Sequence, residues 1–287
     1  MNKPKPLLLL GGSGWIGGCL LQALSEASDL FDVLTSYSQH QPSDQFKSFK
    51  FNYNSPEQFF EIVDKFEPRI IINALAGVDE TLYKLHINMV EYAKNNHVYY
   101  VYISSSMVFD ADLAHPHHEH DLIGAESEYG KFKQRCEEAM SDSMSQAAIF
   151  RLSAVHGWNP NKESRTERFL HKLQSGQTIS VDKNVFQNRL TVIDLAQTMA
   201  EVVKLLAPGI FHLGTVDSNE EVVFLTKLAQ EFGYDASQVI PVESKLKILT
   251  TIPDRTLKLL GNKFQKTETQ TLSAIAKIPA LQKYKKL

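Results

Sequence analysis

The sequence predicts an α/β fold with a doubly wound parallel sheet of the Rossmann type, followed by a smaller C-terminal lobe. Two observations carry this prediction. An apolar run at residues 7–10 passes directly into glycines spaced G-x-x-G-x-x-G, and an apolar helix follows. Strand-like and helix-like patterns then alternate through the first half of the chain, which is typical of a parallel sheet with helices on both faces.

The glycine-rich turn predicts a nucleotide site at the start of the chain. Gly11, Gly14 and Gly17 let the backbone turn tightly and let a pyrophosphate approach bare N–H groups at a helix N-terminus. A turn needed only for packing gives the same pattern, so the glycines alone are weak evidence. Their place between a strand and a helix favours a nucleotide-binding βαβ unit. We therefore expect these glycines, with Trp15 and Ile16 between them, to bind the cofactor.

The later elements follow from composition and periodicity. Buried or β-rich runs predict strands at residues 31–36, 69–75, 98–104, 147–153 and 209–214. Apolar residues on one face predict helices that begin near Ser55, Leu82, Tyr129, Arg165, Thr191 and Ser218. The tail from about Pro241 is expected to hold short helices.

The regular alternation loosens after Trp158, so we expect two lobes that pack tightly on each other. Residues 1–158 and about 189–215 would form the dinucleotide-binding Rossmann domain. The substrate-binding lobe would comprise residues from about 159 to 188, together with residues 216–287.

The bulk composition fits an ordinary soluble globular protein. The chain has 287 residues, of which 43% are hydrophobic and 22% charged, and its formal charge is −3. This charge gives no reason to expect nucleic acid or a membrane surface as a partner, and no run of about 18 apolar residues is present to span a bilayer. Cys19 and Cys136 are the only cysteines, which excludes a disulfide framework and fits a reducing cytoplasm.

Tyr129 and Lys133 are spaced for chemistry on one helix face. At positions i and i+4 they are neighbours, and a nearby ammonium favours the phenolate of a tyrosine, whose free pKa is about 10. A tyrosine tuned in this way can give or take a proton at a carbonyl or an alcohol. Ser104, Ser105 and Ser106 stand at the carboxyl end of a predicted strand, where ligands bind in open α/β sheets. The plain alternative is that serines only terminate the strand, and we accept it for two of the three.

Several short motifs occur in order along the chain. Besides the glycine turn they are Asn73-Ala74-Leu75-Ala76, Asn88, Ile103-Ser104-Ser105, Val108-Phe109-Asp110, Tyr129-Gly130-Lys131-Phe132-Lys133, Glu137, Arg151-Leu152-Ser153 and the segments 190–196 and 209–213. This set resembles the extended short-chain dehydrogenase/reductases, and more narrowly their dTDP-4-dehydrorhamnose reductase-like branch. The resemblance covers nearly the whole chain and is weakest after Pro241.

The resemblance implies a role for each matching residue. Tyr129 would be the proton donor, Lys133 its electrostatic partner and a ligand of the nicotinamide ribose, and Ser105 would orient the substrate carbonyl. Asn52 stands where relatives often carry an adenine-binding Asp. Further cofactor contacts are implied at Ala74, Leu75, Ala76, Asn88, Leu152 and Ser153.

The sequence departs from the branch in three places that bear on the substrate. The segment 73–88 is several residues shorter than in typical sugar reductases, and the stretch 252–255 matches an Arg-Pro segment only loosely. Ser106 and Met107 replace an Asp-Tyr pair. We place Ser106, Met107 and His156 at the substrate, although a packing role fits His156 equally well.

The end of the second strand bears on the choice of cofactor. Thr35, Ser36 and Tyr37 are expected to meet the adenosine ribose, and none is a carboxylate that would repel a 2′-phosphate. Asp32 lies at about the right spacing from Gly11, but near the beginning of the strand. No arginine stands there to bind a 2′-phosphate. We expect NADP(H) as the preferred cofactor, with NAD(H) as the alternative.

A histidine-rich stretch precedes the predicted catalytic helix. Such side chains can ligate a metal ion. The density of the cluster and Pro116 inside it favour an irregular loop on the substrate side, and we assign no metal site. The stretch contains His115, His117, His118 and His120, together with Glu119 and Asp121.

Together these observations predict an NAD(P)-dependent reductase of a nucleotide-linked 4-keto sugar. One alternative is a nucleotide-sugar epimerase or dehydratase that retains NAD. Another is a non-catalytic dinucleotide-binding regulatory subunit, like the β subunit of methionine adenosyltransferase, against which the intact Tyr129, Lys133 and Ser105 count. We expect a cytoplasmic protein, compatible with a homodimer, whose partner is a small-molecule nucleotide sugar.

Overall fold

The structure is a computed structural model that describes residues 3–286. Its main sheet contains β1 (Lys5–Leu10), β2 (Phe31–Tyr37), β3 (Lys47–Lys50), β4 (Ile70–Asn73), β5 (Tyr99–Ser105), β6 (Ala147–Leu152) and β11 (Gly209–Leu213). All seven strands are parallel, in the order β11-β6-β5-β4-β1-β2-β3. The order reverses between β1 and β4, and the carboxyl ends of strands at such a point form a ligand crevice.

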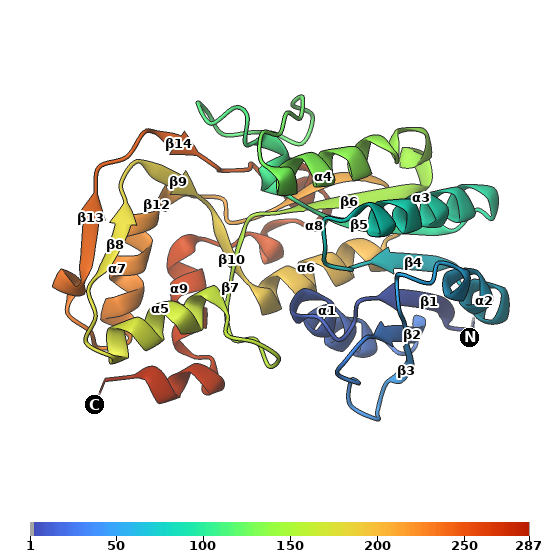
Figure 1. Ribbon diagram of the computed structural model, residues 1–287, viewed down its shortest axis with the longest axis horizontal. Coiled ribbons are helices and arrows are strands. Elements are labelled where there is room, and N and C mark those ends of the chain that lie inside the picture. The colour runs from blue at the N-terminus through green and yellow to red at the C-terminus, as the bar shows by residue number, and fades with distance from the viewer. Residues whose placement is uncertain (1–2, 287) are drawn as a thin grey trace.

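Helices cover both faces of this sheet (Figure 1). The side chains of β1 alternate, as a strand requires: Leu7 and Leu9 pack with α1 (Trp15–Ser25) and α6 (Val192–Lys204). Leu8 and Leu10 face the opposite core, formed with α2 (Glu57–Phe66), α3 (Glu80–Asn95) and α4 (Glu128–Glu138). A continuous leucine run is therefore the expected sequence of a strand that is buried on both faces.

The C-terminal part of the chain builds a second core from short elements. The strands are β7 (Ala154–His156), β8 (Ile179–Asp182), β9 (Val185–Gln187), β10 (Arg189–Thr191), β12 (Asn219–Glu220), β13 (Val239–Val242) and β14 (Lys247–Ile248). They pair as β7–β10, β12–β9–β14 and β8–β13. The helices are α5 (Arg165–Gln174), α7 (Glu221–Glu231), α8 (Asp254–Leu260) and α9 (Glu268–Ala276). Phe169, Leu170, Phe224 and Ile275 lie in this core.

The fold class predicted from the sequence is confirmed, while several local predictions are wrong. The tail after Pro241 holds the expected short helices α8 and α9, but β13 and β14 occur there as well. The helix expected from Ser218 begins at Glu221, because the two preceding residues pair with β9. The helix expected to begin near Ser55 begins at Glu57, with Pro56 as its N-cap. Within residues 3–286, no helix is long and apolar enough to cross a membrane.

Candidate active site

The glycine-rich turn links β1 to α1 at the carboxyl edge of the sheet. Gly11 has a φ of +92°, and a Cβ there would lie 2.6 Å from the carbonyl oxygen of Ala74. A Cβ on Gly17 would overlap the Gly11 carbonyl. Gly14 differs, because its φ is −74° and a Cβ there would meet only the Gly11 carbonyl oxygen, at 3.1 Å. The turn itself requires Gly11 and Gly17, whereas Gly14 leaves the N-terminus of α1 open to an anion.

A cavity of about 200 Å³ lies beside this turn, at the carboxyl ends of β1, β2 and β4. Neutral side chains line it, so its walls fit the adenosine and pyrophosphate end of a dinucleotide without charge repulsion. Six of the residues predicted to bind the cofactor line this cavity: Gly11, Gly14, Ser36, Ala74, Leu75 and Ala76.

Ser36 and Asn52 make contacts within the protein that the sequence did not predict. The Ser36 hydroxyl is buried and accepts the Gly11 N–H at 2.9 Å, so it supports the turn, while Tyr37 also lines the cavity. The Asn52 side chain is exposed, and its Oδ1 accepts the backbone N–H of Asn54 at 3.1 Å. Asn52 does not line the cavity of 200 Å³.

Trp15 and Ile16, like Asn52, do not line this cavity. The Trp15 indole N–H donates to the carbonyl oxygen of Trp158 at 2.8 Å, and Ile16 packs half-buried against the core. A second bond runs the other way, from Asn161 Nδ2 to the carbonyl oxygen of Ser13 at 2.7 Å. These two bonds tie the glycine turn to the segment that leads into α5.

Ser105, Tyr129 and Lys133 come together where β5 ends and α4 begins. Ser105 is the last residue of β5, and its Oγ accepts the Met107 N–H at 3.2 Å. Tyr129 lies in the first turn of α4 and is 44% exposed, and the Ser105 hydroxyl is close enough to affect its pKa. Lys133 follows one turn later, is only 6% exposed, and donates from Nζ to the carbonyl oxygen of Ile103 at 2.8 Å.

The surroundings of these groups set their protonation. Partial burial raises the pKa of the Tyr129 phenol, and the nearby Ser105 hydroxyl acts in the opposite direction. Burial lowers the pKa of the Lys133 ammonium to about 8. This ammonium lies 4.7 Å from the ring centroid of Tyr102 and 5.7 Å from that of Tyr129. The sequence led us to expect a lowered pKa for Tyr129, whereas burial raises it in the structure, so the phenol is protonated at neutral pH and can donate.

A buried charge network supports the carboxyl end of β5. Glu137, one turn after Lys133, accepts hydrogen bonds from the Ser104 hydroxyl and from Arg151, with 2.8 Å between Arg151 Nη2 and Glu137 Oε2. Both side chains of this ion pair are 3% exposed. The network joins α4 to β5 and β6 and thereby positions Tyr129. Sequence reasoning matched Glu137 and Arg151 to family motifs without giving them a role; the available signal was an arginine inside an otherwise apolar strand.

Other predicted residues lie at or near the same edge of the sheet. Leu152 ends β6 and Ser153 follows it; the Ser153 hydroxyl is buried and has no hydrogen-bond partner among residues 3–286. Ser106 and Met107 begin a 3₁₀ helix (Ser106–Phe109) directly after Ser105. Asn88 lies half-buried along α3.

His156 is packed inside the protein. Its Nδ1 lies 3.1 Å from the hydroxyl oxygen of Thr166, and its ring lies 4.8 Å from that of Phe224. Burial holds the pKa of His156 well below its usual range, so the imidazole is neutral. It forms part of the wall of a cavity of about 170 Å³, together with Arg165 and Arg168.

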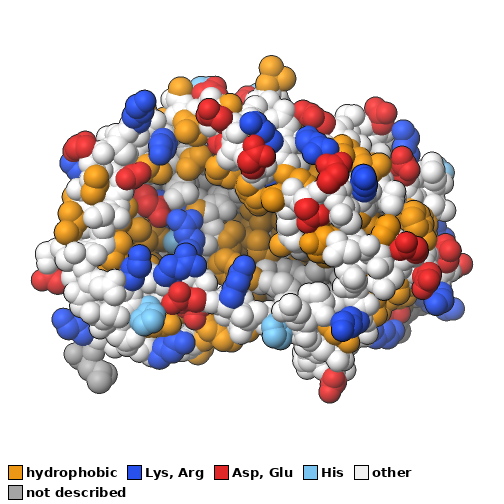
Figure 2. All heavy atoms as spheres, viewed as in Figure 1, with side chains coloured by type: hydrophobic (Ala, Val, Ile, Leu, Met, Phe, Trp, Pro, Cys, Tyr) orange, Lys and Arg blue, Asp and Glu red, His pale blue; other side chains and the backbone are white. Residues whose placement is uncertain are grey.

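The face between the sheet and the C-terminal core is hollowed, and Lys and Arg side chains gather near the hollow over α5 (Figure 2). Arg165, Arg168 and Lys172 are the cations of α5 that line the cavity of 170 Å³. Arg165 pairs there with Glu221, which also lines the cavity, at 3.0 Å, and Arg168 pairs with Glu163 at 3.6 Å.

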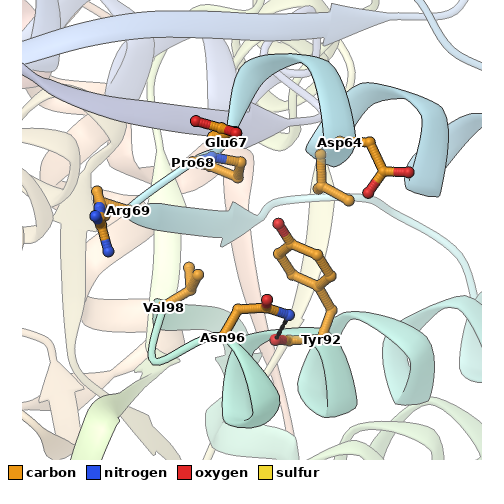
Figure 3. A pocket seen from close by; sticks show the side chains of 8 residues that line it. Asp64, Glu67, Pro68, Arg69, Tyr92, Asn96 and Val98 are labelled. Atoms are coloured by element: carbon orange, nitrogen blue, oxygen red, sulfur yellow. Dashed lines mark hydrogen bonds between the residues drawn. The ribbon is translucent and has the colours of Figure 1, made fainter.

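A larger cavity, of about 560 Å³, lies at the opposite edge of the sheet. Arg69 and Val98, which precede β4 and β5, line it together with Tyr92 and Asn96 (Figure 3). Asn96 turns back and donates from Nδ2 to the Tyr92 carbonyl oxygen at 2.9 Å. Because ligands of open α/β sheets bind at the carboxyl ends of the strands, this cavity lies outside the candidate active site.

The parallel sheet, the open glycine turn and the Ser–Tyr–Lys cluster define a class of protein, the extended short-chain dehydrogenase/reductases. The chain belongs to the RmlD substrate binding domain family, which its sequence matches over residues 5–272. This is a family of NAD(P)-dependent reductases, so the family and the enzyme class predicted from the sequence are confirmed.

Individual relatives agree with this assignment. The dTDP-4-dehydrorhamnose reductase of Salmonella typhimurium is 27% identical over 224 residues, which are 72% of this chain and 71% of that protein. The structure of a dTDP-4-dehydrorhamnose reductase from Bacillus anthracis in complex with NADP superposes with a TM-score of 0.78 at 18% identity, covering 96% of this chain and 98% of that one. A dTDP-glucose 4,6-dehydratase of the same organism, in complex with NAD, gives 0.80 at 13% identity and covers 95% of each chain. The solved structures show that the fold is shared.

Proposed function

We propose that the protein reduces a nucleotide-linked 4-keto sugar with NADPH. The observation that carries the proposal is the meeting of Ser105, Tyr129 and Lys133 at the carboxyl end of β5, on the same sheet edge as the open glycine turn. The substrate class is supported by the similarity to the dTDP-4-dehydrorhamnose reductase of Salmonella typhimurium. The cytoplasmic location and the small-molecule partner expected from the sequence belong to this proposal.

The catalytic residues act on the carbonyl oxygen of the sugar. A bound nicotinamide would supply the hydride. As negative charge develops on the oxygen, the Ser105 hydroxyl donates a hydrogen bond to it and Tyr129 gives it the phenolic proton. Lys133, held by the Ile103 carbonyl, stabilises the phenolate that remains.

The cofactor would bind with its pyrophosphate at the N–H groups beside Gly14 and its adenosine in the cavity of about 200 Å³. Tyr37, at the end of β2, lines this cavity. Asp32 lies at the other end of that strand, where it pairs with Lys47 at 2.6 Å. Since no carboxylate lines this cavity to repel a 2′-phosphate, NADP(H) is the preferred cofactor of the proposal.

The proposal is tested by mixing the purified protein with NADPH and dTDP-4-dehydrorhamnose and following NADPH oxidation. We expect one NADPH to be consumed per sugar reduced, and NADH to react more slowly. NAD retained through purification, with sugar turnover that needs no added cofactor, would instead identify an epimerase or dehydratase. Cofactor binding without turnover of any 4-keto sugar in a panel would identify a regulatory subunit.

The variant Gly14→Ala tests whether the glycine turn binds the cofactor. Its φ of −74° suits any L residue, and the added methyl would lie 3.1 Å from the Gly11 carbonyl oxygen, at the exposed N-terminus of α1. We expect the Kd for NADPH to rise about tenfold or more, with little change in the thermal unfolding midpoint. Gly124→Ala, where a Cβ would lie 3.8 Å from its nearest neighbour, is the control and should leave the Kd unchanged. Equal affinity in all three proteins would refute the assignment of the phosphate site.

The pH dependence of reduction follows from Lys133. The lysine is protonated below its pKa of about 8, and its charge is lost as the pH rises through that value. The Tyr129 phenol, whose pKa is raised, keeps its proton over the same range. We therefore expect kcat/KM for the keto sugar to fall as the pH rises through about 8, measured from initial rates at fixed ionic strength. A flat profile between about pH 7 and pH 9 would contradict this role of Lys133.

A further inference from the structure

We propose that His115, His117 and Asp121 form a binding site for a divalent transition-metal ion of the zinc type. They lie in the loop between the 3₁₀ helix after β5 and α4, the green loop before α4 in Figure 1. Each offers one ligand atom, and these atoms lie within 4.8 Å of one another. The sequence alone gave no reason to prefer a metal here, because it does not show which ring nitrogens face each other.

The tautomer of His117 points to a cation. Its Nε2 lies 2.8 Å from the carbonyl oxygen of Asp112, and since a carbonyl can only accept, Nε2 carries the hydrogen. In the neutral ring Nδ1 therefore presents a lone pair. This nitrogen is buried and has no hydrogen-bond partner among residues 3–286, and it faces Asp121 Oδ2 at 3.7 Å. Two acceptors that face each other at this distance leave room for a positive ion between them.

His115 repeats the same arrangement. Its Nδ1 lies 2.9 Å from the carbonyl oxygen of Pro116 and is therefore a donor, so in the neutral ring the lone pair is on Nε2. Nε2 faces a carboxylate oxygen of Asp112 at 3.2 Å. Histidines that ligate metals commonly donate their other N–H to a backbone carbonyl, which fixes both the tautomer and the ring orientation. Both rings of this cluster are held in that way.

The donor set selects the class of ion. Two imidazoles and one carboxylate suit zinc and its neighbours, whereas calcium and magnesium prefer oxygen ligands throughout. The His117 ring is fixed by stacking on Phe109, with 4.2 Å between ring centroids. His115 is exposed and Asp121 half-buried, so an ion can enter from solvent and keep water in its remaining coordination positions.

The site lies where the loop joins the C-terminal part of the chain. The His117 N–H donates to the Thr250 carbonyl oxygen at 3.0 Å, and the Ile252 N–H donates to the His117 carbonyl oxygen at 2.8 Å. The Ile248 N–H also donates to the Leu113 carbonyl oxygen, at 2.9 Å. A bound ion would therefore fix the loop before α4 at the point where it pairs with residues 248–252.

The test is calorimetric titration of the full chain with zinc chloride, after removal of metals with a chelator. We expect saturable binding of one ion per chain. His115→Gln and Asp121→Asn should each raise the Kd about tenfold or more, as expected when a ligand is lost. Both side chains are at least partly exposed, so these variants should fold, which circular dichroism can verify.

His171→Gln is the matched control, because His171 is an exposed histidine that also faces a carboxylate, that of Glu163, at 3.2 Å. It should bind zinc like the unaltered protein. In a parallel titration with cobalt(II), the visible absorption of a four-coordinate ion should appear in the control and disappear in Asp121→Asn. The proposal is overturned if zinc does not bind saturably, or if His171→Gln weakens binding as much as His115→Gln.

Discussion

Tyr129→Phe is expected to lower kcat for reduction of the 4-keto sugar by about 10²- to 10⁴-fold, the usual contribution of a positioned proton donor. The variant keeps the ring and removes only the hydroxyl, whose pKa the nearby Ser105 affects. Because partial burial keeps this phenol protonated at neutral pH, the proton it supplies is present before the substrate binds. The loss should therefore appear in the chemical step and not in cofactor affinity.

Single-turnover oxidation of NADPH at saturating sugar measures this step, and calorimetry measures the NADPH Kd, which should change less than about threefold. Tyr83→Phe is the control: this tyrosine lies on α3, 4.0 Å from the guanidinium carbon of Arg135, away from the candidate site. It should keep the normal rate. Turnover by Tyr129→Phe within about twofold of that rate would show that another group gives the proton.

Arg189→Met is expected to lower the free energy of unfolding by about 3–5 kcal/mol, the usual result of removing one partner of a buried ion pair. Arg189 is fully buried in β10. Its guanidinium contacts the carboxylates of Glu268 and Glu221, the latter at 2.6 Å, and donates to the Gln187 carbonyl oxygen at 2.8 Å. Methionine fills much of the volume over the Phe224 ring but leaves the carboxylates without their cation.

The size of this loss should depend on pH. Burial raises the pKa of Glu268, even though Arg189 lies beside it. Burial also tends to raise the pKa of Glu221, but the charges of Arg189 and Arg165 outweigh this effect and lower the pKa of Glu221. Without Arg189 the Glu268 carboxyl takes up a proton on folding, so its folded pKa lies further above the unfolded one. Stability gained from that proton is present at low pH and lost as the pH rises through the folded pKa. The deficit should therefore be smaller near about pH 5 than near about pH 8.

Urea unfolding of the two proteins at both pH values measures these differences. Arg189→Met combined with Glu268→Gln should recover part of the lost stability, because it removes one unpaired carboxylate. Arg168→Met is the control, since that arginine is exposed and its contact with Glu163 is 3.6 Å long. A loss below about 1 kcal/mol for Arg189→Met, typical of an exposed ion pair, would mean that the buried cluster does not stabilise the fold.

Local patterns in the sequence were enough to predict the main sheet and its helices. The leucine run of β1 and the β-branched residues of β4 mark strands that are buried on both faces, and such strands need no long-range information to be recognised. β3 was missed because Lys47–Lys50 is a short edge strand with a lysine at each end. β13 was missed because Pro241 lies inside it, and proline is tolerated only where a strand does not need that N–H.

Some features of the candidate site could likewise be predicted from the sequence, and others could not. Tyr129 and Lys133 are one helical turn apart, so their spacing alone predicts that they are neighbours. The contacts of Ser36 and Asn52 could not be predicted, because several nearby groups compete for each side chain. The pair of Arg189 and Glu268 is separated by 79 residues, and only the folded chain shows that these opposite charges meet. The direction of the Tyr129 pKa depends on burial and on where the Lys133 ammonium turns, which a motif does not contain.

The position of β11 has a consequence for folding during synthesis. This strand completes the main sheet by pairing with β6, yet the chain between the two strands must first build α5, β8, β9 and α6. Until residue 213 has been made, β6 is an edge strand without its partner β11. All six residues of β6 are buried in the folded protein. Open apolar edges pair with other chains. The main sheet is therefore complete only when about three quarters of the protein has been translated.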